Sequence, residues 1–218
     1  MHILHTLDLF GTVVFATSGA LTARKQRRNC AIALLYAMLT ALGGGTMRDL
    51  LLARPVFWLQ WNSLSFMRSP AYGLLALTAG LITFWLSARA HIRTEHLWLA
   101  NAISLATFTT IGTQVALQQF ALIPYAHPLW VLAPVMGLLT GVGGGAIRDI
   151  LDTQTNRIFQ RPYEAIAALS GGIVYSCLAL VQVPDSITLT ATMLTTVMML
   201  PAPKALLIRL LSAYLPQF

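Results

Sequence analysis

Long apolar stretches separated by short polar ones make up almost the whole chain. They predict seven membrane-spanning helices, at about residues 3–23, 29–53, 70–88, 97–117, 128–151, 163–181 and from 186 onward. Most of these stretches contain roughly 20 residues, the length needed to cross the hydrocarbon core of a bilayer. Pro201 and Pro203 interrupt the last stretch before an amphipathic tail, residues 204–215. We therefore expect the last helix either to kink there or to be followed by a segment on the membrane interface.

The second and fifth stretches contain the same block, LTALGGGTMRDLL at 39–51 and LTGVGGGAIRDIL at 139–151. The third and sixth also match, YGLLALTAG with YEAIAALSG, and Gly11-Thr12 matches Gly112-Thr113 loosely. We therefore predict one transmembrane domain, 1–218, with internal repeats 3–88 and 97–181 and an extra helix and tail 186–218. Three spans are an odd number, so the second repeat enters the membrane with opposite polarity, as in inverted-repeat proteins.

Each repeated block contains three consecutive glycines near the middle of its span. Glycine costs about 1 kcal/mol relative to alanine in a helix, so a triple glycine predicts a break there. Freed backbone carbonyls are tolerated at membrane depth only inside protein or along a water-filled cavity. The predicted ion pathway comprises Gly43, Gly44, Gly45, Gly143, Gly144 and Gly145, with the hydroxyls of Thr40, Thr140, Ser18 and Thr113. The alternatives are close helix packing by the glycines and hydroxyl bonds to the helix's own backbone.

Each block ends with Arg-Asp, residues 48–49 and 148–149. Each such charge costs about 2.5–3.5 kcal/mol at membrane depth unless it is paired or faces water. The simplest interpretation is buried ion pairs, Arg48 with Asp49 or Arg148 with Asp149, or pairs that link one half to the other. Direct contact of Asp49 or Asp149 with a permeating ion is the alternative. Inverted polarity would place the two Arg-Asp pairs on opposite sides of the membrane.

The composition supports a membrane protein and excludes an ordinary soluble domain. Hydrophobic residues make up 56% of the chain and charged residues only 10%, against about 25% charged in soluble domains. The formal net charge of +7 comes from basic residues in loops, so it indicates topology rather than nucleic-acid binding. With the N-terminus outside and the C-terminus in the cytoplasm, ten basic residues lie inside and two outside, not counting the repeated blocks. The cluster Arg24, Lys25, Arg27 and Arg28 could also attract anionic lipid headgroups.

The sequence contains no pattern typical of an enzyme, a nucleotide site or a resident metal. The five histidines lie at helix ends or in loops, and the two cysteines allow no disulfide framework. We therefore expect no cofactor, and no bound metal beyond a transient K⁺ ion.

Twin GGGxxRD blocks, seven spans and an odd extra helix resemble the bacterial members of the trimeric intracellular cation channel (TRIC) family. The same paired domain occurs in bacterial membrane proteins called glycine transporters. The resemblance implies a bacterial inner-membrane homotrimer in which every protomer has its own potassium-permeable pore. It also implies that the second and fifth helices are broken at Gly43–Gly45 and Gly143–Gly145.

Three functions therefore remain as hypotheses. A monovalent-cation channel for potassium is favoured, because freed carbonyls and hydroxyls can replace the hydration shell of such an ion. A secondary transporter of a small solute such as glycine would use the same repeat with alternating access, with Arg48 or Arg148 as a counter-charge. A lipid-binding or assembly scaffold without any pathway is the third, and mid-membrane glycines favour it least.

Overall fold

The computed structural model describes residues 2–56, 70–89, 94–122, 127–151 and 162–201. These residues form α1 (His2–Lys25), α2 (Cys30–Leu51), α3 (Pro70–Arg89), α4 (Thr94–Phe120), the 3-10 turn η1 (His127–Leu132), α5 (Ala133–Leu151), α7 (Pro162–Leu180) and α8 (Asp185–Met198). The prediction of an all-α chain with a helix in each of the seven apolar stretches is confirmed for this part of the chain. The amphipathic tail 204–215 lies outside it.

Local chemistry explains several helix ends. The Asn29 side chain caps α2 by accepting a hydrogen bond from the Ile32 amide, 3.0 Å away. This bond satisfies one of the amides that lack a partner in the first turn. At the other end of the chain, α8 follows Pro184 and stops at Met198, before Pro201. Whether the chain kinks or continues on the interface beyond Pro201, the two alternatives expected from the sequence, lies outside the described residues.

Four of the described helices are long and apolar enough to cross a membrane: Thr6–Lys25, Cys30–Leu51, Trp130–Leu151 and Pro162–Leu180. In α3 the apolar part is shorter, Ala71–Leu86. The 27 residues of α4 include many threonines, and most of these are buried. With 14 residues, α8 is about 21 Å long, against a hydrocarbon core of about 30 Å. The prediction of seven membrane spans is therefore confirmed in part: the described residues contain seven α-helices, of which four meet this criterion.

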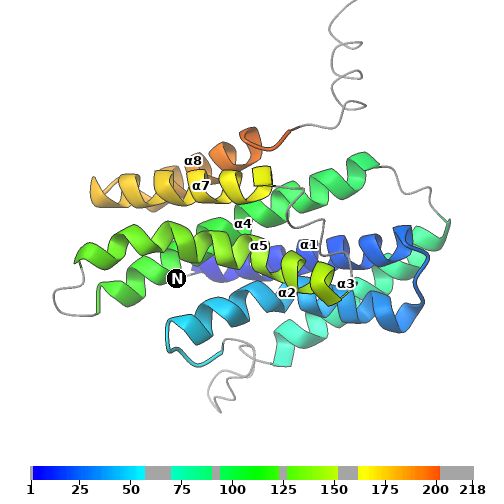
Figure 1. The fold of residues 1–218 in the computed structure, drawn as a ribbon. Helices are drawn as coiled ribbons and strands as arrows, with labels where there is room; N and C mark the ends of the chain where they lie inside the picture. Colours follow the sequence, from blue (N-terminus) through cyan, green and yellow to red (C-terminus); the bar gives the residue numbers. More distant parts are fainter. Residues whose placement is uncertain (1, 57–69, 90–93, 123–126, 152–161, 202–218) are drawn as a thin grey trace, which may run out of the picture.

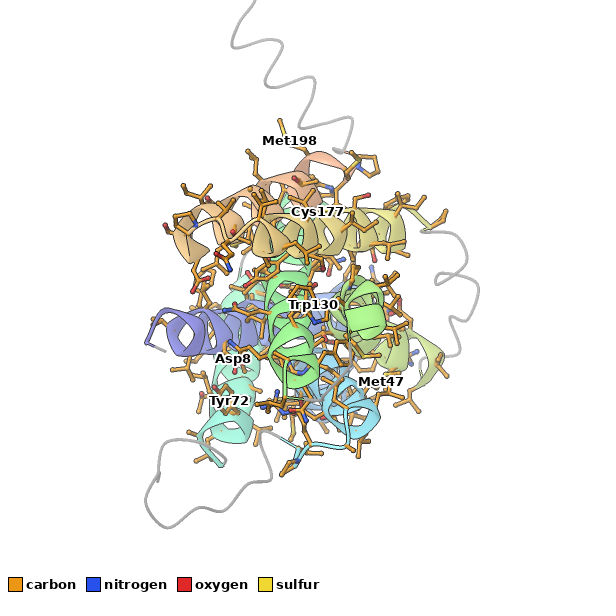
Figure 2. All side chains as sticks on the ribbon, turned by 90° about the vertical axis from the view of Figure 1, so that its left-hand side faces the viewer. Asp8, Met47, Tyr72, Trp130, Cys177 and Met198 are labelled. Atoms are coloured by element: carbon orange, nitrogen blue, oxygen red, sulfur yellow. The ribbon has the colours of Figure 1, made fainter. Side chains whose placement is uncertain are left out.

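The helices lie side by side and alternate in direction along the bundle (Figure 1). The pairs α1–α2, α4–α5 and α2–α5 pack most extensively, and α8 packs against α4 and α7. Large apolar side chains such as Trp85, Leu86 and Leu194 are well exposed on the outside, as expected of a lipid-facing surface. The bundle is shown in Figure 2 from the end at which Asp8 and Tyr72 lie.

The predicted breaks at the triple glycines are wrong for this structure. Both α2 and α5 run without interruption through their glycine blocks, and none of the described glycines has a positive φ. The penalty of glycine is a propensity, and close tertiary packing routinely overrides propensity. The alternative role of the glycines, close helix packing, is the one that the structure shows.

Candidate functional site

The two glycine blocks meet where α2 crosses α5. A Cβ atom added to Gly44 would overlap the carbonyl oxygen of Thr140, and one added to Gly144 would overlap the carbonyl oxygen of Thr40. Gly43 and Gly143 face the side chains Ile147 and Met47, again in reciprocal fashion. The contacts run in opposite order along the two helices, so the crossing is antiparallel. Only glycine allows two backbones to approach this closely.

Each buried arginine pairs with the aspartate that follows it. The Nε and Nη2 atoms of Arg48 both donate to Oδ1 of Asp49 at 2.8 Å, and Arg148 donates to Asp149 in the same way. All four residues are at least nine-tenths buried. Pairing offsets the cost of burying each charge. Each arginine thus pairs within its own helix, which is one of the pairings that the sequence left open. The antiparallel crossing places the two pairs on opposite sides of it.

The predicted pathway hydroxyls bond mostly to their own helices. Thr40, Thr140 and Thr113 donate to the carbonyl four residues earlier, over 2.6, 2.6 and 2.9 Å. The oxygens of Thr40 and Thr140 also lie against Gly19 and Gly112, in the α1–α2 and α4–α5 interfaces. These contacts match Gly112 with Gly19 rather than with Gly11, which faces Phe108. The assignment of these hydroxyls to an ion pathway stays a prediction.

Ser18 differs from those threonines, because its hydroxyl donates to Oδ1 of Asn101 on another helix, 2.9 Å away. The amide of Asn101 in turn donates to Oε1 of Glu164 in the first turn of α7, over 3.3 Å. Three helices are therefore joined at this end of the bundle by a short polar chain. The hydroxyl of Ser18 thus bonds to a neighbouring helix, and its assignment to an ion pathway stays a prediction.

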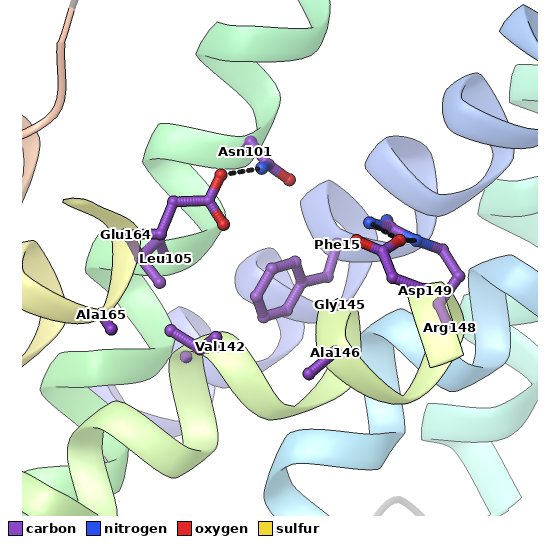
Figure 3. Close-up of a pocket in the computed structure, with 11 residues that line it drawn as sticks. Phe15, Asn101, Leu105, Val142, Gly145, Ala146, Arg148, Asp149, Glu164 and Ala165 are labelled. Carbon is purple, nitrogen blue, oxygen red and sulfur yellow. Dashed lines mark hydrogen bonds and ion pairs between the residues drawn. The ribbon is translucent and has the colours of Figure 1, made fainter. Parts of the chain in front are cut away.

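A pocket of about 90 Å³ lies beside this polar chain, between α4, α5 and α7 (Figure 3). Its polar lining consists of Asn101, Arg148, Asp149 and Glu164, and its apolar lining includes Phe15 and the second glycine block at Gly145. Two carboxylates and one guanidinium give the pocket a formal charge of −1. Among the described residues, Nη1 of Arg148 has no hydrogen-bond partner. This arrangement favours a small cation. It would also suit a zwitterion whose anionic group accepts a hydrogen bond from the guanidinium of Arg148.

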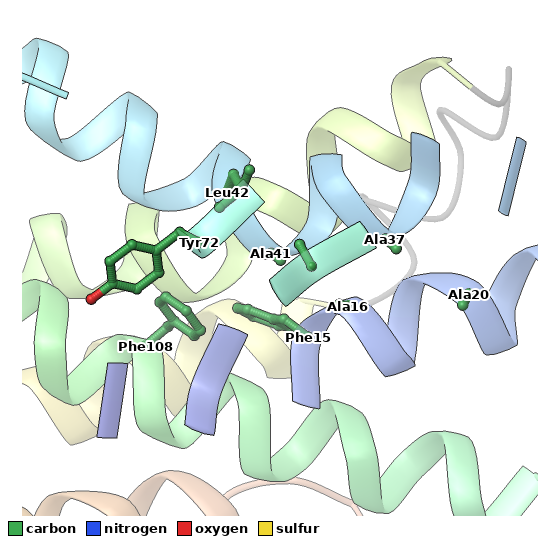
Figure 4. Close-up of a cluster of buried hydrophobic side chains, with 9 residues drawn as sticks. Phe15, Ala16, Ala20, Ala37, Ala41, Leu42, Tyr72 and Phe108 are labelled. Atoms are coloured by element: carbon green, nitrogen blue, oxygen red, sulfur yellow. The ribbon is translucent and has the colours of Figure 1, made fainter. Parts of the chain in front are cut away.

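Phe15, in the lining of this pocket, stacks on the ring of Phe108. The ring centroids of Phe15 and Phe108 are 4.7 Å apart, with an interplanar angle of 25°. They belong to a buried cluster with Leu42, Tyr72 and five alanines of α1, α2 and α3 (Figure 4). The hydroxyl of Tyr72 donates to Oδ2 of Asp8 at 2.8 Å.

The sequence prediction missed four of these residues: Glu164, Asn101, Phe15 and Phe108. A charged residue and an amide within apolar stretches were visible signals for Glu164 and Asn101. The two phenylalanines carried no such signal, because a single aromatic residue in an apolar helix looks like any other core residue.

The basic cluster predicted to bind lipid headgroups lies at the end of α1 and in the turn that follows. Arg24 stacks on the ring of Phe84 at 4.8 Å, whereas Lys25, Arg27 and Arg28 are exposed. Within the described ranges, no three residues among His, Cys, Asp and Glu are grouped so that they could hold a metal ion.

Comparison with known proteins places the chain among membrane proteins. The model of a family described as "Glycine transporter" matches it twice, at residues 5–88 and 98–180. The inner membrane protein YadS of Escherichia coli, a UPF0126 protein, is 35% identical over 178 residues, which cover 80% of this chain and 78% of YadS.

Two solved structures also share this architecture. One is a trimeric intracellular cation channel orthologue from Rhodobacter sphaeroides, with 32% identity and a TM-score of 0.76 over 91% of this chain and 95% of that one. The other is a structure of TRIC cation channels, with 28% identity and a TM-score of 0.71 over 98% of this chain and 96% of that one.

Proposed function

Because this chain belongs to the glycine transporter family of membrane proteins and has the fold of TRIC cation channels, we propose that it conducts monovalent cations across a membrane. The observation that carries the proposal is the α2–α5 crossing within this fold. There two glycine blocks bring the backbones together, and an ion pair within each helix lies beside them, next to a pocket of negative formal charge. A negative pocket raises the local concentration of cations and disfavours anions.

The permeant ion in this proposal is potassium, and the pathway runs through each protomer rather than between protomers. The Asn101, Ser18 and Glu164 oxygens are of the type that replaces water around such an ion. The trimeric assembly of the R. sphaeroides protein supports a homotrimer. The location of YadS supports a bacterial inner membrane, and the loop charges support an external N-terminus. Anionic lipids would bind at Lys25, Arg27 and Arg28.

The pathway would follow an inverted repeat, with 3–88 and 97–181 as its halves. Two matches to one family model support the duplication, and the reciprocal contacts across the antiparallel α2–α5 crossing support the inversion. In such proteins the site forms near the midplane, where the two halves meet. In this proposal that place is the Gly44–Gly144 contact, where α2 and α5 cross.

A secondary transporter of a small zwitterion such as glycine is the second candidate. The family description supports it, and so does the pocket, which offers a carboxylate at Glu164 and a guanidinium nitrogen without a partner at Arg148. In this alternative, Arg148 would pair with the carboxylate of the solute and Glu164 with its ammonium group.

Current through the purified protein in a planar bilayer, under a potassium gradient with and without glycine, tests both candidates. We expect unitary current steps that reverse near the potassium equilibrium potential and do not change when glycine is added. If the bilayer shows no unitary currents and liposomes take up glycine saturably, the channel proposal is refuted in favour of the transporter. Glu164→Gln should lower the unitary conductance at low potassium and leave it nearly unchanged at high potassium, since a fixed charge matters most when ions are scarce.

A further inference from the structure

A polar pair joins the first and third helices of each repeat, and the two pairs lie at opposite ends of the bundle. The same interval along the chain separates Asp8 from Asn101, Phe15 from Phe108 and Gly19 from Gly112. Asp8 accepts a hydrogen bond from Tyr72 of α3, and Asn101 donates one to Glu164 of α7. The first bond joins α1 to α3 at one end of the bundle, and the second joins α4 to α7 at the other end.

The two ends differ in what the second member of each pair does. At the Glu164 end, a short and flexible carboxylate lines the pocket described above. At the Asp8 end, the aromatic ring of Tyr72 is only 3% exposed and packs in one cluster with Leu42 and Phe108.

The Phe15–Phe108 stack stands between the pocket and Tyr72. Phe15 lines the pocket and also belongs to the buried cluster of Tyr72, so apolar side chains lie directly between the pocket and Tyr72. Phe108 is 1% exposed and Phe15 4% exposed. A hydrated cation loses its water at such a layer without gaining oxygen ligands, so an apolar constriction blocks conduction.

We propose that Tyr72, together with the Phe15–Phe108 stack, is a gate, and that the hydrogen bond from Tyr72 to Asp8 holds it shut. This inference rests on the proposed pathway. The structure is then a closed state whose pathway is accessible from the Glu164 end and blocked toward the Asp8 end. Opening requires the Tyr72 ring to leave Phe108 and Leu42, and the stacked rings to separate.

The first test compares Tyr72→Phe with the wild-type protein by single-channel recording in planar bilayers. This variant keeps the ring and removes the hydroxyl. Loss of one hydrogen bond should raise the ratio of open to closed time about fivefold and leave the unitary conductance unchanged. Tyr175→Phe is the matched control, because Tyr175 is also 3% exposed but lies in a different cluster. Equal open times in Tyr72→Phe and the wild type would overturn the gate.

A second measurement separates failure of the gate from failure of the channel proposal. In a background where Cys30 and Cys177 are replaced by serine, single cysteines at Ala146 and Ala41 report access in proteoliposomes. Ala146 lines the pocket, whereas Ala41 is buried in the cluster of Tyr72. A membrane-impermeant cationic thiol reagent should modify Ala146→Cys readily. It should modify Ala41→Cys about fivefold faster once Tyr72→Phe is added, in step with the open-to-closed ratio.

The two outcomes are distinguishable. A wild-type protein without unitary currents would refute the channel, while the Tyr72-dependent labelling of Ala41→Cys would still support a gate in a transport pathway. Labelling of Ala41→Cys that does not depend on Tyr72 would refute the gate, whatever the currents show. Phe108→Leu, which shortens the stack while keeping an apolar side chain, should also raise both the open time and the labelling rate.

Discussion

Alanine at Gly144 tests whether the glycine blocks exist for close backbone contact. A Cβ atom there would overlap the Thr40 carbonyl oxygen and would lie 3.1 Å from the Leu39 carbonyl oxygen. Both neighbours are backbone atoms of a helix, so they cannot move aside as a side-chain end could. The helices α2 and α5 would have to separate, and their packing would be lost along the crossing.

The magnitude follows from a comparison with Gly145→Ala in the same block. At Gly145 the nearest atom to an added Cβ is Nη2 of Arg148, at 3.7 Å, which is ordinary van der Waals contact. Both substitutions gain about 1 kcal/mol of helix propensity. The difference between them therefore isolates the clash, which we expect to cost about 1–3 kcal/mol, as overpacking of a rigid interior does.

The free energy of unfolding of both variants can be measured by denaturant titration in mixed micelles. Gly145→Ala should be as stable as the wild type or more stable, and Gly144→Ala less stable than Gly145→Ala by the stated amount. Gly44→Ala should repeat the Gly144 result, because its Cβ would meet the Thr140 carbonyl oxygen. Equal stability of Gly144→Ala and Gly145→Ala would refute the argument that backbone contact explains the glycines.

Two further predictions concern stability. Asp49→Asn should destabilise the protein by about 3–5 kcal/mol, because it leaves the buried guanidinium of Arg48 without its counter-charge. Arg48→Met combined with Asp49→Leu should recover most of that loss. Thermal unfolding in detergent measures the stability of both variants, and a double variant as unstable as the single one would contradict the prediction. Gly171→Ala should cost about 1–3 kcal/mol because its Cβ would overlap the hydroxyl of Thr196 on α8, and Thr196→Ala in the same chain should restore part of it. Absence of rescue in that double variant would show that the cost arises elsewhere.

The sequence by itself determined the features that depend on local chemistry. The length of each apolar stretch predicts a helix, and every one of the seven contains a helix in the described part of the chain. The Arg-Asp dipeptides predicted buried ion pairs, because an isolated charge is too costly in an apolar interior. The repeated glycine blocks indicated that α2 and α5 hold equivalent places, and the two helices do meet at those glycines.

Only the tertiary structure decided what the glycines and the neighbouring polar residues do. A triple glycine predicts a break from propensity alone, but the approach of Thr40 and Thr140 from the facing helix keeps α2 and α5 continuous. The hydrogen bond between Asn101 and Glu164 and the stack of Phe15 on Phe108 join residues far apart in the sequence. Such contacts depend on how the helices cross, and the crossing is set by packing over whole helix faces, which no single stretch of sequence contains.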